Sequence, residues 1–295
     1  MTTKSYIAYK NMAEGFSDVS ETVKTVEKIA ASAVHFLKRK VSALDSYAAE
    51  TEKILARLSL FLREEDSPFF REGKGGGATL VVLTGDKGLV GGLWHKVVNA
   101  VLNGAERYQS LVVVGAKGEG YLKEEGAPPA KLFPGFSDAP EEAEIKSVAD
   151  YVLGEFGKGR FSRVDIAYPG FVSLAEQEAV LVPFLPFGFF PEEKGRVSAA
   201  RKSPAGFPIF EPSKKEFFDR LLLKYIGVFF RKIAMETKLS ELSARTVAME
   251  HASAKTDELI KKLKINCAKE RRRRITRGQL ENFAAREASE RRERI

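Results

Sequence analysis

Apolar residues recur at helical spacing near both ends of the 295-residue chain. In the first part, the stripe with steps of mostly three and four residues consists of Val19, Val23, Val26, Ala30, Ala33, Leu37, Val41, Leu44, Ala48, Leu55, Leu58 and Leu62. In the last part, the corresponding positions are Leu242, Met249, Ile260, Leu263 and Cys267. A seam of about 3.5 residues lets two helices wrap around each other. We therefore expect the two segments to pair, antiparallel because the chain between them returns.

The positions of proline and glycine support long helices at both ends. All 12 prolines lie between Pro68 and Pro212, and 21 of the 24 glycines lie in the same range. Proline ends helices and glycine weakens them, so the segments on either side can be helical throughout. An alternative interpretation is that two separate amphipathic helices pack on a globular core.

The segment between these arms alternates between strand-like and helix-like stretches. Residues 78–84 form a short, nearly continuous apolar run, which is typical of a strand buried on both faces. Residues 111–114 and 164–168 predict two further strands, and residues 93–102 predict a helix. Strands separated by helices indicate a mostly parallel sheet.

The expected fold class is α/β, with a long antiparallel coiled coil of the N- and C-terminal helices and a central Rossmann-like α/β domain. Residues 1–67 are the N-terminal coiled-coil helix, residues 68–212 the central α/β domain, and residues 213–295 the C-terminal coiled-coil helix with a basic tip. Residues 194–212, rich in Pro, Gly and Ser, are the expected linker into the last helix.

The positive charge is concentrated at the C-terminal end. Residues 261–295 contain 13 Lys and Arg against 5 Asp and Glu, which accounts for the whole net charge of +8. Such an end favours an acidic partner: nucleic acid, an anionic membrane or an acidic protein surface. No apolar run is long enough to span a membrane, and the first residues lack the apolar region of a secretory signal. A soluble protein of a reducing, bacterial cytoplasm is expected.

The sequence contains few residues that could form a catalytic, cofactor or metal site. One cysteine and three histidines argue against a disulfide framework and against multi-thiolate or histidine-rich metal sites. The glycine clusters at 73–77, 86–92 and 115–120 match neither the Walker A pattern nor the dinucleotide-binding GxGxxG. No nucleophile stands in a recognisable turn near His95. The sequence therefore predicts no catalytic residues, no cofactor and no metal.

Several motifs resemble those of one known family. Residues 240–249, SELSARTVAM, resemble the SExxARxxAM signature of the γ subunit of F-type ATP synthases. Residues 86–92, DKGLVGG, resemble the family's DRGLCGG, and residues 30–32 resemble part of its first helix. Residues 259–276 continue the resemblance at the family's spacing without a gap. The order of these motifs along nearly the whole chain makes the resemblance specific.

The resemblance implies a rotor that performs no reaction itself. In the family, the two long helices form an asymmetric coiled coil inside a ring of three α and three β subunits. The central domain stands on the ε subunit and the membrane c-ring, and ion flow turns the shaft so that the β sites change affinity in sequence. The resemblance also implies a peripheral location on the cytoplasmic face of the bacterial inner membrane, no nucleic acid partner and no direct membrane insertion.

The same resemblance assigns three residues to contacts with the β subunit. Val26 stands where the family has a methionine near the β interface. Arg271 and Arg272 fall on the Arg and Gln of the family's Asn-x-x-Arg-Gln motif, and Ala268 stands where that motif has its Asn. Only the arginine is retained, so the chain is identified as a divergent member.

Two other interpretations stay open from the sequence alone. The basic run 271–274 also suits a coiled-coil adaptor with a nucleic-acid-binding C-terminus, although Phe283 is the only aromatic residue near it for base stacking. The other interpretation is a nucleotide-dependent enzyme built on the central sheet. The charged end, residues 285–295, is expected to protrude beyond the bearing of the ring or to meet an acidic rim.

Overall fold

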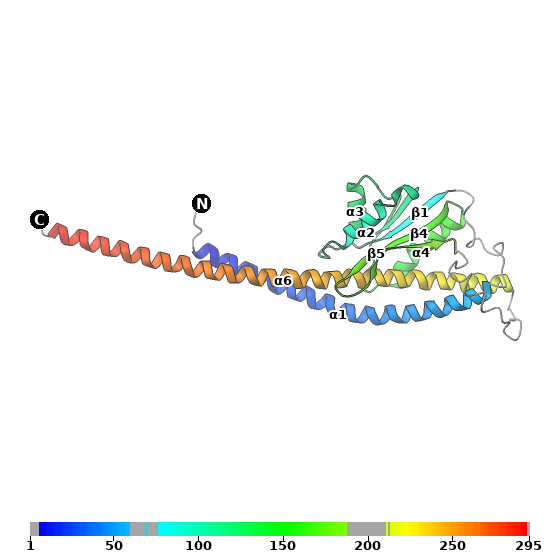
Figure 1. Cartoon of the computed structure of the whole chain (residues 1–295), viewed down its shortest axis with the longest axis horizontal. Helices are drawn as coiled ribbons and strands as arrows, with labels where there is room; N and C mark the ends of the chain where they lie inside the picture. The colour runs from blue at the N-terminus through cyan, green and yellow to red at the C-terminus, as the bar shows by residue number, and fades with distance from the viewer. Residues whose placement is uncertain are drawn as a thin grey trace. The chain divides into compact units, whose positions relative to one another are not determined.

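A computed structural model describes residues 6–59, 76–187 and 213–293, together with Phe69, Gly73 and Glu211 (Figure 1). The side chains of residues 56–59, 214 and 287–293 are not among those described. The chain divides into two compact units, of which the first comprises Met1–Ile29 and Thr246–Ile295 and the second Ala30–Arg245. Each long helix contributes to both units.

The two long helices predicted from the proline-free arms are confirmed. Helix α1 runs over Tyr6–Ser59 and helix α6 over Lys214–Glu293. The predicted boundary at 67/68 and the predicted linker, except Glu211, lie outside the described residues. The predicted start of the last segment at 213 directly precedes the first residue of α6.

In the first unit the two helices pair antiparallel. The Ser20 hydroxyl donates to the Asp257 carboxylate at 2.9 Å, and the Cys267 thiol lies 3.5 Å from the Tyr6 carbonyl. An earlier position on α1 thus meets a later one on α6. Buried and half-buried residues of α6 include a series with steps of four and three, which is the 3.5-residue seam of a coiled coil: Met249, Ser253, Thr256, Ile260, Leu263, Cys267 and Glu270.

The seam differs from the predicted stripe at one position of α1. Val19 was predicted to face the partner helix, but its side chain is 49% exposed and the neighbouring Ser20 is buried instead. Ser20 is accommodated because its hydroxyl is hydrogen-bonded to Asp257, which removes the cost of burying an unpaired polar group. The predicted positions Leu58 and Leu62 fall outside the described side chains.

In the second unit, the same two helices form an apolar cluster of their own. It consists of Ala30, Val34, Leu37 and Val41 from α1 and Met235, Leu239 and Leu242 from α6. An ion pair of 2.7 Å between Asp45 of α1 and Lys232 of α6 continues this pairing. The pairing in both units confirms the predicted antiparallel coiled coil and excludes two helices folded apart.

The central sheet has five strands in the order β3-β2-β1-β4-β5. The first four strands in this order are parallel, and β5 pairs with β4 antiparallel. The strands are β1 (Gly77–Leu83), β2 (Ser110–Val114), β3 (Lys131–Phe133), β4 (Phe161–Phe171) and β5 (Gln177–Leu185). The predicted strands at 78–84, 111–114 and 164–168 and the mostly parallel sheet are therefore confirmed, whereas β3 and β5 were not predicted.

Helices cover both faces of this sheet, because the central strand β1 has apolar side chains on both faces. Leu80 and Val82 of β1 pack on one face beside Val97 and Val98, whereas Val81 and Leu83 pack on the other. The first face is covered by α2 and the second by α4 and the early part of α6 (Figure 1). The helices that follow β1, β2 and β3 are α2 (Leu93–Leu102), η3 (Ala105–Arg107), α3 (Ala116–Glu124) and α4 (Glu142–Gly157).

Candidate functional site

Three charged side chains of α6 are buried together where this helix meets the central domain. They are Lys238, Glu241 and Arg245, with side-chain exposures of 4%, 0% and 8%. Their spacing of three and four residues places them on one face of the helix. Lys238 Nζ lies 2.7 Å from Glu241 Oε2, and Arg245 Nη2 lies 2.6 Å from Glu241 Oε1. Each oxygen of the buried carboxylate is therefore paired with its own cation. We call these three residues the α6 ion cluster.

The α6 ion cluster also reaches two loops of the central domain. Arg245 Nη2 donates to the Gly88 carbonyl at 3.4 Å, in the loop between β1 and α2. Lys238 Nζ lies 3.4 Å from an oxygen of Asp138, which precedes α4, and Lys87 Nζ lies 2.9 Å from the other oxygen. Burial raises the pKa of Asp138, but the hydrogen bond from Lys87 and the charge of Lys238 together outweigh it, so that this pKa lies below its ordinary value.

The loop after β1 is held by its own side chains. Asp86 accepts hydrogen bonds from the backbone N–H of Ala116 at 2.8 Å and of Gly135 at 3.0 Å. Ala116 begins α3, so a protein carboxylate already stands at this helix N-terminus, where a phosphate group would bind in a nucleotide site. A nucleotide phosphate would have to displace Asp86, which argues against the enzyme interpretation of the central sheet.

The three residues assigned to β contacts lie in the first unit, where α1 and α6 pair. Val26 is half-buried on α1, whereas Arg271 and Arg272 are exposed on α6. Because Ser20 faces Asp257, Val26 lies level with residues near 251, about 20 residues or about 30 Å along the helix from Arg271. The structure therefore does not bring Val26 and the arginines into one site.

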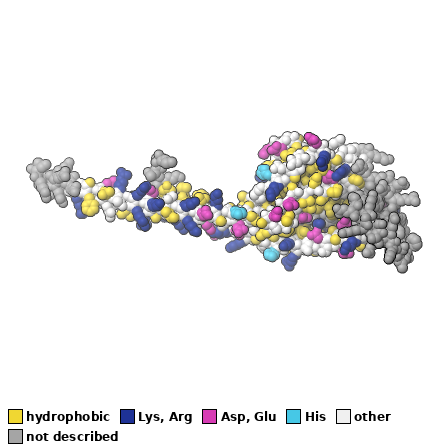
Figure 2. Space-filling model, in the orientation of Figure 1, with side chains coloured by type: hydrophobic (Ala, Val, Ile, Leu, Met, Phe, Trp, Pro, Cys, Tyr) yellow, Lys and Arg dark blue, Asp and Glu magenta, His cyan; other side chains and the backbone are white. Residues whose placement is uncertain are grey.

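The basic run of α6 is partly engaged within the chain. Arg273 pairs with Glu270 at 2.9 Å, and the Arg274 guanidinium lies 5.4 Å from the centre of the Tyr6 ring. Arg271 and Arg272 form no ion pair with any residue that the structure describes. Figure 2 shows Lys and Arg side chains spread along this part of α6. The guanidinium groups of these two residues are thus available to a partner.

The other candidate groups for chemistry do not converge. His35 and His251 are exposed on the long helices, and the His95 ring packs on Tyr121 with the ring centres 4.1 Å apart. In the described ranges, no three His, Cys, Asp or Glu side chains gather where a metal ion could bind. None of the described helices has the length and apolar character to cross a membrane.

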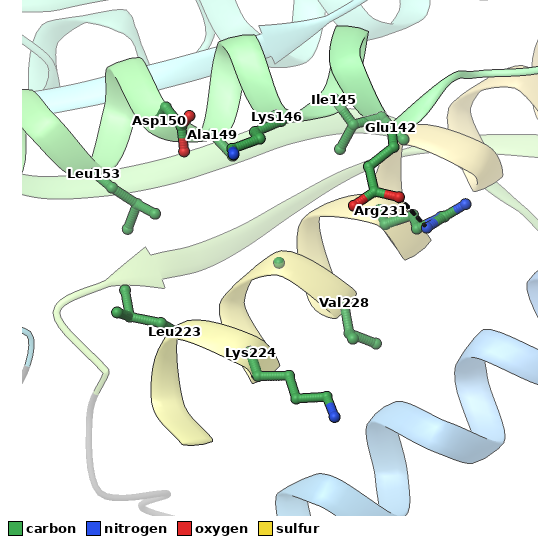
Figure 3. Close-up of a pocket in the computed structure, with 11 residues that line it drawn as sticks. Glu142, Ile145, Lys146, Ala149, Asp150, Leu153, Leu223, Lys224, Val228 and Arg231 are labelled. Atoms are coloured by element: carbon green, nitrogen blue, oxygen red, sulfur yellow. Dashed lines mark ion pairs between the residues drawn. The ribbon is translucent and has the colours of Figure 1, made fainter. Parts of the chain in front are cut away.

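A groove of about 440 Å³ opens between α4 and α6 (Figure 3). Ile145, Ala149 and Leu153 of α4 line one side, and Leu223 and Val228 of α6 line the other. At the rim, Glu142 and Arg231 lie 3.7 Å apart and compensate each other's charge. Lys146, Asp150 and Lys224 also line the groove, so it carries charged side chains beside its apolar ones.

A buried glutamate lies where α6 meets the end of β4. Glu236 accepts the backbone N–H of Phe171 at 3.1 Å and is hydrogen-bonded to Tyr168. Burial is the largest influence and raises the pKa of Glu236, although the Phe171 hydrogen bond and the Lys232 charge oppose it. Burial and the neighbouring Glu236 carboxylate likewise raise the pKa of Tyr168.

We predict that Glu236→Gln gains stability relative to the wild type as the pH rises above the ordinary glutamate pKa of about 4.3. Above about pH 4.3, the ordinary glutamate pKa, the unfolded chain releases this proton before the folded chain does. Ionisation of Glu236 therefore lowers the free energy of unfolding over this range, and the glutamine variant escapes that loss. Urea unfolding at a series of pH values measures the difference, with the exposed Glu178→Gln as the control for charge removal. A variant that loses stability relative to wild type with rising pH would contradict the prediction.

The sequence motif pointed to only part of this site. Glu241 and Arg245 belong to the SELSAR segment, but Lys238 and Asp138 were not singled out. A usable signal for Lys238 was present: it precedes Glu241 by three residues, which places both side chains on the same helix face. No local pattern could find Asp138, because its contact with Lys238 spans 100 residues of sequence.

Comparison with known proteins places the whole chain in one family. The family model described as ATP synthase matches residues 8–288. Among curated relatives, the ATP synthase gamma chain of Acidovorax sp. is 28% identical over 88% of this chain and 91% of its own length. The gamma chain of Nostoc sp. is 29% identical over 95% of this chain and 98% of its own length.

Solved structures agree on the fold. A chain of the Euglena gracilis mitochondrial ATP synthase rotor matches with a TM-score of 0.63, at 17% identity, over 92% of this chain and 98% of that chain. A chain of the Tetrahymena thermophila mitochondrial ATP synthase central stalk and c-ring matches with a TM-score of 0.57, at 19% identity, over 79% of this chain and 99% of that chain. The chain belongs to the ATP synthase family, and its curated relatives there are gamma chains, as the sequence motifs predicted.

Proposed function

We propose that the chain is the central-stalk rotor, or gamma, subunit of an F-type ATP synthase. It couples transmembrane ion flow to ATP synthesis and hydrolysis at the β subunits by rotation, and it performs no reaction of its own. Its partners are three α and three β subunits, the ε subunit and the c-ring. It is a peripheral subunit on the cytoplasmic face of the bacterial inner membrane, and it binds no nucleic acid.

The observation that supports this function best is the pairing of the two ends of one chain. The two helices share a seam with steps of four and three residues, which makes a coiled coil that resists bending and twisting. A single chain has no threefold symmetry, so it presents a different surface to each of three identical sites around it. A shaft that must change three β sites in sequence needs both properties.

The direct test is assembly followed by coupling. The full chain, co-expressed with the α, β and ε subunits of the same organism, should co-purify in a stoichiometric complex with ATPase activity. Reconstituted with the membrane sector in vesicles, this complex should pump ions when ATP is added. An active ring of α and β subunits that leaves the chain unbound would overturn the proposal.

We predict that Arg271→Ala combined with Arg272→Ala weakens binding to the ring of α and β subunits about tenfold, which is about 1.4 kcal/mol. Charge-assisted hydrogen bonds from a guanidinium are among the stronger polar contacts, and these two arginines are not engaged by other described residues. Titration of the ring with labelled full-length chain measures the affinity. Arg273→Ala is the matched control, because Arg273 already pairs with Glu270. A loss of binding free energy in the double variant that is only twice the loss in Arg273→Ala would show that only net charge matters.

The nucleic-acid alternative makes the opposite prediction. It requires affinity for DNA or RNA that falls steeply with salt, because neutralised phosphates release counterions. The described structure offers one exposed aromatic residue near the basic run, Phe283, nine residues beyond Arg274 and not interleaved with it. Salt-sensitive binding of the full chain to a DNA duplex, without binding to the ring, would favour the adaptor.

A further inference from the structure

The α6 ion cluster is an unusual way to attach a helix to a domain. Leu239 and Leu242 of the same segment pack in apolar contacts with α1, as helix packing ordinarily does. By contrast, Glu241 is completely buried between two cations. Well-packed apolar residues of similar volume are often at least as stabilising as a buried ion group. Stability alone therefore does not account for charges at this place.

An ion cluster restricts the rotation of a helix against its neighbour, which an apolar contact does only weakly. Apolar contact depends on buried area and tolerates small rotations of one surface over another. A buried carboxylate that moves away from its cations is left unpaired where water cannot solvate it, and the energy rises steeply with displacement. Arg245 and Lys238 extend this constraint to Gly88 and Asp138, in two different loops of the central domain. Rotation of α6 about its own axis would break both connections.

The surroundings of Glu241 leave little room for such movement. A Cβ atom added at Gly85 would lie 2.8 Å from Glu241 Oε2 and 2.8 Å from the Trp94 ring, so the β1–α2 loop passes directly over the carboxylate. Trp94 Nε1 in turn donates to the Lys87 carbonyl at 3.1 Å, and Ala244 of α6 packs in one cluster with Trp94, Val90 and Leu93. The loop that receives the α6 ion cluster is therefore itself fixed.

We propose that Lys238, Glu241 and Arg245 lock the rotational register between α6 and the central domain, so that torque passes between them without slip. The inference rests on the proposed rotor function. Torque tends to rotate α6 about its own axis, and apolar packing resists this rotation less than it resists separation of the helix from the domain. The α6 ion cluster opposes movement in that direction. The three residues are positioning residues and touch no nucleotide.

The discriminating variant replaces the charges with apolar side chains of similar size: Lys238→Met, Glu241→Leu and Arg245→Met together. It leaves no buried charge unpaired, so the chain should fold and assemble. In vesicles with the complete complex, ATP hydrolysis should persist. The number of ions pumped per ATP should fall at least twofold when pumping works against an imposed ion gradient, and should change little without a gradient. Lys238→Arg, which keeps the charge, should couple like wild type.

A stability effect is separated from a coupling effect by a second variant. Val98→Ala removes buried volume from the apolar cluster on the α2 side of the sheet, where the Val98 side chain is 2% exposed and packs with Leu80 and Val82. It should lower the unfolding midpoint while coupling under load stays at the wild-type value. Full coupling under load by the triple apolar variant would overturn the inference. Failure of the wild-type chain to assemble or pump would instead overturn the rotor function itself.

Discussion

Replacing Gly115 with alanine is expected to destabilise the central domain by roughly 2–6 kcal/mol, from about 1–3 for backbone strain and about 1–3 for overpacking. Gly115 has a φ of 101°, which side-chain-bearing residues rarely adopt. A Cβ atom there would lie 2.7 Å from Gly85 N and 2.8 Å from Thr84 O. Both are backbone atoms and cannot turn aside. The loss is a large fraction of a typical domain stability of about 5–15 kcal/mol.

Gly120→Ala, in the helix that follows Gly115, provides a control with the opposite sign. Gly120 lies inside α3, and a Cβ added there meets no atom within 4 Å. Alanine is the better helix former, so this variant should gain up to about 1 kcal/mol. Trp94 is the only tryptophan of the chain and is buried in this domain, so its fluorescence during urea unfolding reports both changes. A stable Gly115→Ala variant would show that the turn can be rebuilt.

The features that the sequence predicted well are those that one segment determines by itself. The long helices follow from the absence of proline, and α2 begins and ends at the predicted residues. The apolar run of β1 predicted burial on both faces, and Leu80 to Leu83 are indeed 0% exposed. In each case the pattern that predicts the element lies within one short segment, so the signal can be read without knowledge of distant contacts.

The features that were not predicted depend on distant neighbours. Strand β5 contains Pro183, which argues against a strand, yet β5 is at the edge of the sheet, where a missing N–H is tolerated. Strand β3 spans only three residues, too few for a period to be visible. The buried Ser20 and the contact between Lys238 and Asp138 each need a partner more than 90 residues away. The sequence resemblance predicted the rotor function, but the contacts of Val26, Arg271 and Arg272 with the β subunit stay predictions.

Replacing Phe230 with alanine is expected to destabilise the second unit by about 3–5 kcal/mol, because it empties a fully buried aromatic position. Phe230 of α6 is 0% exposed and lies 5.8 Å, centre to centre, from the Phe184 ring of β5. Leu223→Ala is the control on the same helix: Leu223 is 46% exposed, so its loss should cost less than about 1 kcal/mol. Urea midpoints followed by Trp94 fluorescence compare the two variants.

Phe230→Ala also tests whether attachment and register of α6 are separate properties. The aromatic core around Phe230 supplies adhesion between α6 and the sheet, whereas the α6 ion cluster is proposed to fix the angle of the helix. Phe230→Ala should therefore lower the unfolding midpoint but leave ion pumping under load intact at temperatures where the variant is folded. The apolar replacement of Lys238, Glu241 and Arg245 should show the reverse. If both variants lose coupling in proportion to their loss of stability, the strength of attachment between α6 and the central domain is enough to explain torque transmission.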